Sequence, residues 1–157
     1  MPENGWRAAY LLLRLLIAIQ VGLPYPSLMR DRSFLKRFAL GIYVICFSIG
    51  VLTHTLDFVQ LGPRPYAWAP LPFEVFWSSL VILDALVIVI LLTGFLKVGL
   101  SLSAMIMIVD VLVNFYTLIV LENDGFAFAV PLQALFLGFV LGSIGFLWPR
   151  SETSALQ

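Results

Sequence analysis

Long apolar runs, each close to or above the roughly 20 residues that cross a bilayer, fill most of this chain. The runs are nearly unbroken and do not alternate between polar and apolar residues, so they predict helices rather than strands. Lipid offers no partner to backbone N–H and C=O groups, which also favours helices. We therefore predict an all-α, polytopic membrane helical bundle in which residues 1–157 form a single transmembrane domain.

Five transmembrane helices are predicted from these runs. Their expected bounds are Trp6–Leu23, Phe38–Gln60, Phe73–Phe95, Leu100–Leu121 and Pro131–Trp148. The first run contains Arg14, so four spans are the alternative if that helix lies along the membrane interface. The sequence after this run lacks a small-residue cleavage pattern, and we expect the helix to be retained rather than removed as a signal peptide.

The composition excludes several functional classes. The chain is 61% hydrophobic and 11% charged, whereas soluble domains average about 45–50% apolar and about 25% charged. A net charge of zero gives no electrostatic reason to bind nucleic acid. The single cysteine, Cys46, excludes an intrachain disulfide, and the single histidine excludes a bis-histidine haem within one subunit. With no serine-nucleophile, phosphate-loop or His-rich motif, we predict no cofactor and no metal site.

Lysine and arginine residues predict the orientation of the chain. One side would hold the loop Tyr25–Arg37, the Gly94–Gly99 hairpin and the tail, with basic residues Arg30, Arg32, Lys36, Arg37, Lys97 and Arg150. The other side would hold Arg7 and Arg64. The positive-inside bias therefore predicts that the basic first loop and the C-terminus are cytoplasmic and that the N-terminus faces outward.

Two connections carry further information. The Gly94–Gly99 hairpin is so short that the third and fourth helices should pack as antiparallel neighbours. The segment Gly62–Pro72 contains four prolines, whose fixed dihedral angles predict a stiff, extended outer loop. Its aromatic residues Tyr66 and Trp68 suit the headgroup layer. The loop would serve as a plain connector or, alternatively, as a lid or a partner-docking strip.

Polar side chains inside the apolar runs are the candidate functional residues, because a charged group at membrane depth is costly unless it is paired, hydrated or neutralised. At a helical rise of about 1.5 Å per residue, these side chains fall between the bilayer midplane and the outer surface. They come from four helices, and they are Arg14, His54, Asp57, Asp84, Asp110 and Asn114. The alignment predicts a hydrated, outward-facing pocket.

Charge limits what this pocket would do. Arg14 can pair with one carboxylate, and a protonated His54 with Asp57, which leaves at least one of Asp84 and Asp110 without a counter-charge. A buried, unpaired carboxyl group favours its protonated form, and two nearby carboxyl groups favour sharing one proton. The leading hypothesis is that the pocket binds a proton, a cation or a small ligand. The protein would act as a transporter or as the membrane subunit of a larger complex.

Two other functions stay open, one structural and one enzymatic. We favour a function without catalysis. The protein would be a structural, interaction or protective membrane protein without a ligand, with its polar residues as interhelical hydrogen bonds of about 0.6 kcal/mol on average. Alternatively, it would be a cofactor-free membrane enzyme in which His54 and Asp57 act as acid and base on a lipid-like substrate.

A GxxxG pattern, Gly138 with Gly142, lies in the last predicted helix. Such a pattern lets another helix approach closely, whether from this chain, from a second copy or from a partner in a membrane complex. The predicted partners are therefore the lipid bilayer and, through this face, another helix.

Overall fold

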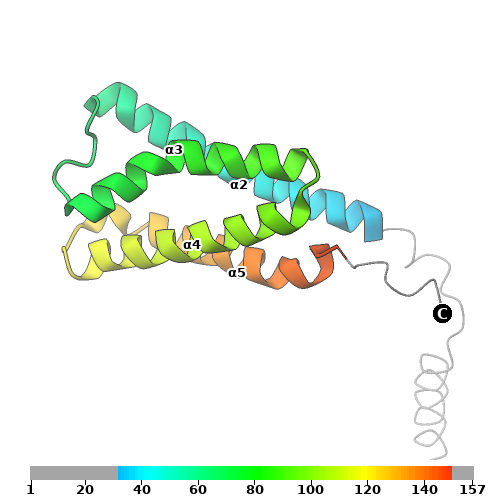
Figure 1. Cartoon of the computed structure of the whole chain (residues 1–157). Helices are drawn as coiled ribbons and strands as arrows, with labels where there is room; N and C mark the ends of the chain where they lie inside the picture. The colour runs from blue at the N-terminus through cyan, green and yellow to red at the C-terminus, as the bar shows by residue number, and fades with distance from the viewer. Residues whose placement is uncertain (1–31, 150–157) are drawn as a thin grey trace, which may run out of the picture. The chain divides into compact units, whose positions relative to one another are not determined.

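The computed structural model describes residues 32–149, which contain helices and turns but no strand. Figure 1 shows the order of the helices along the chain: α2 (Arg32–Leu61), α3 (Leu71–Leu92), α4 (Leu96–Ile119), the short 3-10 helix η2 (Asp124–Phe126) and α5 (Ala129–Leu147). All four α-helices are long and apolar enough to cross a membrane. Within residues 32–149, the all-helical architecture is thus confirmed, and four of the five predicted spans correspond to helices that could cross a membrane. The first predicted span, Trp6–Leu23, lies outside the described residues.

The α3–α4 hairpin has the predicted arrangement, with the two helices packed side by side (Figure 1). Its turn contains Gly94 at a φ of +87°, a backbone conformation that glycine adopts without a steric penalty. Gly99 of α4 lies so close to α3 that a Cβ atom added to it would overlap the Leu91 side chain. The two glycines therefore set the tight turn and the close approach.

The start of α2 differs from the prediction. Arg32, Lys36 and Arg37 were assigned to a loop, but they lie in the first turns of α2. Lysine and arginine are good helix formers, and their side chains can be solvated beyond the apolar part of the helix. A helix of 30 residues is roughly 45 Å long, and it exceeds a hydrocarbon core of about 30 Å. The other helix ends differ from the predicted bounds by only a few residues.

Tyr43 of α2 joins this helix to α5. Its hydroxyl group donates a hydrogen bond to the carbonyl oxygen of Val140 (3.0 Å) and lies 2.9 Å from Oγ of Ser143. The Tyr43 ring is fully buried and packs edge-on against Phe136. Within the described residues, the hydrogen bonds between α2 and α5 come from this one side chain, so the two helices are fastened at the Tyr43 level.

The GxxxG glycines of α5 are exposed. A Cβ atom added to Gly138 or Gly142 would meet no other atom within 4 Å. No other helix of the described residues therefore packs against this pair. Contact with a second copy or with a membrane partner stays a prediction.

Candidate functional site

A cavity of about 640 Å³ lies among the four α-helices, η2 and the loop between α2 and α3. Five of the six predicted site residues line it: His54, Asp57, Asp84, Asp110 and Asn114. The sixth, Arg14, lies outside the described residues. Most of the remaining lining is apolar and includes Phe47, Leu80 and Phe136. The structure therefore brings polar groups from α2, α3 and α4 to one apolar-walled space.

Asp84 is the least partnered of these groups. Asp84 is 5% exposed and borders the cavity. Its carboxylate lies against Gly50 of α2, so closely that a Cβ atom added to Gly50 would overlap Oδ2. No group among residues 32–149 donates a hydrogen bond to it. A buried carboxyl group thus faces the cavity without a protein donor from the described part of the chain.

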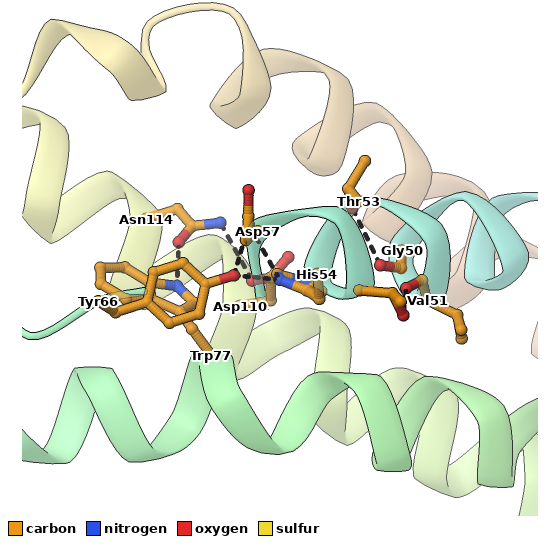
Figure 2. Close-up of polar contacts among 10 residues, drawn as sticks. Gly50, Val51, Thr53, His54, Asp57, Tyr66, Trp77, Asp110 and Asn114 are labelled. Carbon is orange, nitrogen blue, oxygen red and sulfur yellow. Dashed lines mark hydrogen bonds and ion pairs between the residues drawn. The ribbon is translucent and has the colours of Figure 1, made fainter. Parts of the chain in front are cut away.

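Asn114 is the centre of a hydrogen-bond network that joins three helices, and Figure 2 shows its bonds to Trp77 and Asp110. Its Oδ1 accepts a hydrogen bond of 2.8 Å from Nε1–H of Trp77 in α3. Its two amide hydrogens allow Nδ2 to donate both to Oδ1 of Asp110 (3.0 Å) and to Oε1 of Gln133 in α5 (2.8 Å). Asn114 therefore fixes the register of α3, α4 and α5 and supplies Asp110 with its donor.

A second network links His54, Tyr66 and Asp57 (Figure 2). The Tyr66 hydroxyl donates to Oδ2 of Asp57 at 2.6 Å and lies 2.8 Å from Nδ1 of His54. Since the phenol has one hydrogen and gives it to the carboxylate, its oxygen accepts from Nδ1–H of His54. This tautomer is assigned from the hydrogen-bond geometry, and it leaves Nε2 of His54 as an acceptor.

The pKa of Tyr66 is raised above its ordinary value of 10.0, first by burial, then by the hydrogen bond to Asp57 and the negative charges of Asp57 and Asp110. A raised pKa means that the phenol keeps its proton at a pH where exposed tyrosines lose theirs. We therefore expect Tyr66→Phe and the wild type to give the same phenolate absorbance amplitude in a titration to about pH 12. A smaller amplitude in the variant would show that Tyr66 ionises within this range.

The loop between α2 and α3 is not extended, so that prediction is wrong. Residues 65–68 form turns, and the N–H group of Ala69 donates to the Tyr66 carbonyl oxygen. Tyr66 is 8% exposed, and its ring packs against Trp77 with a centroid distance of 5.3 Å. Proline suits turns as well as extended backbone, and burial of the Tyr66 ring favours the turned form. The loop thus closes one end of the cavity.

An ion pair holds the same loop to α3. Arg64 donates from Nε and from one terminal nitrogen to the two carboxylate oxygens of Glu74, at 2.7 and 2.8 Å. The hydrogen bonds and the charge of Glu74 raise the pKa of Arg64, which therefore stays protonated. Two parallel hydrogen bonds of this kind fix the orientation of both side chains. Tyr66 is thereby positioned from two sides, by α2 and by α3.

Sequence reasoning missed three polar or aromatic residues of the site: Tyr66, Trp77 and Gln133. Gln133 carried a usable signal, because it is an amide inside an apolar run, the criterion that selected Asn114. Tyr66 and Trp77 carried none, since aromatic residues near the ends of spans are ordinarily interfacial. Among the described residues, no group of three or more His, Cys, Asp and Glu side chains is arranged to hold a metal ion.

Comparison of the chain with protein-family models, with curated proteins and with solved structures gives no match.

Proposed function

We propose that this membrane protein binds a positively charged species, a proton or a cation, in the cavity between its helices. It would act as a transporter or as the membrane subunit of a larger complex. The observation that carries the proposal is the charge of the lining. Asp57, Asp84 and Asp110 all border the cavity, and no lysine or arginine of residues 32–149 does.

The cost of burying charge explains why this lining favours a cation. An ionised carboxylate away from water is strongly unfavourable unless a counter-charge or hydrogen-bond donors compensate it. Tyr66 donates to Asp57 and Asn114 donates to Asp110, but no described group donates to Asp84. A bound proton or cation would supply the compensation that the described residues do not give to Asp84.

The distribution of basic residues supports an outward-facing site. Arg32, Lys36 and Arg37 lie at the start of α2, and Lys97 lies at the α3–α4 hairpin. If α2 and α3 each cross the membrane once, these four residues share one side, and Arg64 lies on the other. The positive-inside bias would make the four-residue side cytoplasmic. The end of the cavity closed by Tyr66 would then face the exterior.

The test removes the ionisable group of Asp84 or Asp110 and measures ion binding by the full-length protein in lipid nanodiscs. We expect Asp84→Asn and Asp110→Asn each to weaken proton or sodium binding at least about tenfold, because each removes one ionisable group from the lining. Proton uptake with a pH-sensitive dye and radioactive sodium binding provide the readouts. Asp124→Asn is the matched control, since Asp124 is an exposed carboxyl residue outside this cavity.

Folded Asp84 and Asp110 variants that bind both ions as the wild type does would contradict the proposal. Flux assays in sealed liposomes would separate the two roles. Asp84-dependent ion movement across the bilayer indicates a transporter, whereas binding without movement indicates a subunit of a complex.

The structural alternative has its own support in the network around Asn114, which ties three helices together. If fixing helix register is the whole function of the polar residues, Asp84→Asn would leave ion binding unchanged. Asn114 variants would lose stability in either case, so the ion binding of Asp84→Asn is the result that separates the two functions.

A further inference from the structure

Within residues 32–149, the cavity has a lateral mouth between α2 and α5, and this mouth is lined mainly by apolar side chains. Residues that line a cavity and are also exposed mark the place where it opens. They come from these two helices and the residue before α5: Ile49 (55% exposed), Leu132 (50%) and Phe128 (77%), together with exposed Thr53. The opening is therefore a side entrance to the acid-lined space.

The packing of α2 explains why a side entrance exists. Tyr43 hydrogen-bonds to α5, and one turn later Phe47 meets Phe136 of α5 edge-on, with ring centroids 5.6 Å apart. Beyond this contact, α2 borders the cavity instead, through Gly50, Thr53, His54 and Asp57. The Phe47–Phe136 contact therefore bounds the mouth on the side nearer Tyr43.

The depth of the mouth places it beside lipid. Ile49 lies twelve residues before Leu61, the last residue of α2, or roughly 18 Å along the helix axis. Leu132 lies in the first turn of α5. Both helices are apolar enough to cross a membrane, whose hydrocarbon core is about 30 Å thick. An opening that extends so far along the helices would face acyl chains as well as the headgroup region.

We infer that the cavity takes an amphipathic organic cation, an ammonium or phosphonium ion with an apolar body, and that this ligand enters from the lipid. The inference rests on the proposed function and names its ligand class. The charged centre would lie near Asp84 and Asp110, the two buried acids of the lining. The apolar body would contact Phe47, Phe136 and Leu132.

Two features of the cavity separate this ligand class from others. A metal ion could pair with the acids but would gain nothing from a mouth lined by Ile49, Leu132 and Phe128, because apolar walls cannot replace its water ligands. An uncharged acyl chain would leave Asp84 without compensation. A ligand with both a positive charge and an apolar body uses the acids and the walls together.

Tetraphenylphosphonium and tetraphenylborate test the inference, because they have nearly the same shape and opposite charges. We expect the full-length protein in nanodiscs to bind tetraphenylphosphonium saturably above the empty-nanodisc background and not to bind tetraphenylborate. Asp84→Asn should weaken phosphonium binding at least about tenfold. Equal binding of the two ions would overturn the inference.

A bulky side chain at the mouth tests the route. Leu132→Trp should weaken phosphonium binding at least about tenfold, while proton and sodium binding stay unchanged. Leu135→Trp is the matched control, because Leu135 is an exposed residue of α5 outside the cavity lining. If Leu132→Trp does not fold, Ile49→Trp tests the same route from α2.

The outcomes separate the two proposals. Asp84-dependent sodium or proton binding without phosphonium binding would overturn the ligand class and leave the proposed function intact. Phosphonium binding that depends on Asp84 but is unaffected by both mouth variants would overturn the lateral route. If the folded wild type binds neither protons, sodium nor phosphonium, both proposals are wrong.

Discussion

Replacing Asn114 with leucine is expected to lower the free energy of unfolding by about 2–5 kcal/mol. The substitution keeps the approximate size of the side chain but removes three hydrogen bonds, those to Trp77, Asp110 and Gln133. Interhelical hydrogen bonds in membrane proteins contribute about 0.6 kcal/mol on average and up to about 1.7 each. Leucine has no donor or acceptor, so Trp77, Asp110 and Gln133 each lose the partner that Asn114 gives them.

Denaturation of the purified protein in detergent, followed by circular dichroism, measures this loss. Thr117→Val is the matched control, because Thr117 is buried in the same helix but its hydroxyl bonds only to the Val113 carbonyl oxygen of that helix. We expect the control to change stability by less than about 1 kcal/mol. Equal stability of Asn114→Leu, Thr117→Val and the wild type would show that the network does not hold the helices together.

A double-mutant cycle sharpens the same prediction. Trp77→Phe removes the indole N–H that donates to Asn114. Because both substitutions break the same bond, the double variant should lose less stability than the sum of the two single losses. Strict additivity would mean that the bond between Trp77 and Asn114 contributes nothing to folding.

Gly50→Ala is expected to weaken cation binding and to cost up to about 2 kcal/mol of stability, because the overpacking opposes the preference of a helix for alanine over glycine, about 1 kcal/mol. The added methyl group would overlap the Asp84 carboxylate, so either this carboxylate rotates away from its place in the cavity or α2 separates from α3. Overpacking of this kind costs about 1–3 kcal/mol in well-packed proteins. The effect on binding follows because the displaced group is the one that the proposed ligand would meet.

Gly41→Ala is a comparison within the same helix, and we expect it to have the opposite effect on stability. Gly41 lies in the same helix, but a Cβ atom there meets no other atom within 4 Å. Alanine is favoured over glycine in a helix by about 1 kcal/mol, so this variant should be as stable as the wild type or more stable. In an Asp84→Ala background the methyl group at position 50 has room, and the cost of Gly50→Ala should fall. Similar behaviour of the two glycine variants would contradict the close contact between Gly50 and Asp84.

Hydropathy and helical rise predicted much of this arrangement. Long apolar runs predicted the four described helices, and the short hairpin predicted that α3 and α4 are neighbours. Depth along these two helices predicted that Asp84 and Asp110 would border a common space. These inferences need only the period of a helix and the thickness of a bilayer, which do not depend on how the remaining helices cross.

Features that depend on helix crossing and on loop packing were not predictable. Nothing in the sequence indicates that Gly50 faces Asp84, because the crossing of α2 and α3 depends on many side chains at once. Tyr66 is held in the bundle by two contacts, that of its ring with Trp77 and that of its hydroxyl with Asp57. Both contacts depend on how the helices are arranged. The prolines around it predicted a stiff segment but not its direction.

The bond between Tyr43 and α5 also determines how the wall of the cavity can move. Since α2 is pinned to α5 at this level, any displacement of α2 away from α5 is a rotation about Tyr43, and its amplitude grows with distance from the pivot. Ile49 is roughly 9 Å from Tyr43 along the helix, and Asp57 is roughly 21 Å away. Binding of a larger ligand would therefore widen the cavity most at the end farthest from Tyr43. The contact between Tyr66 and Asp57 would be strained first.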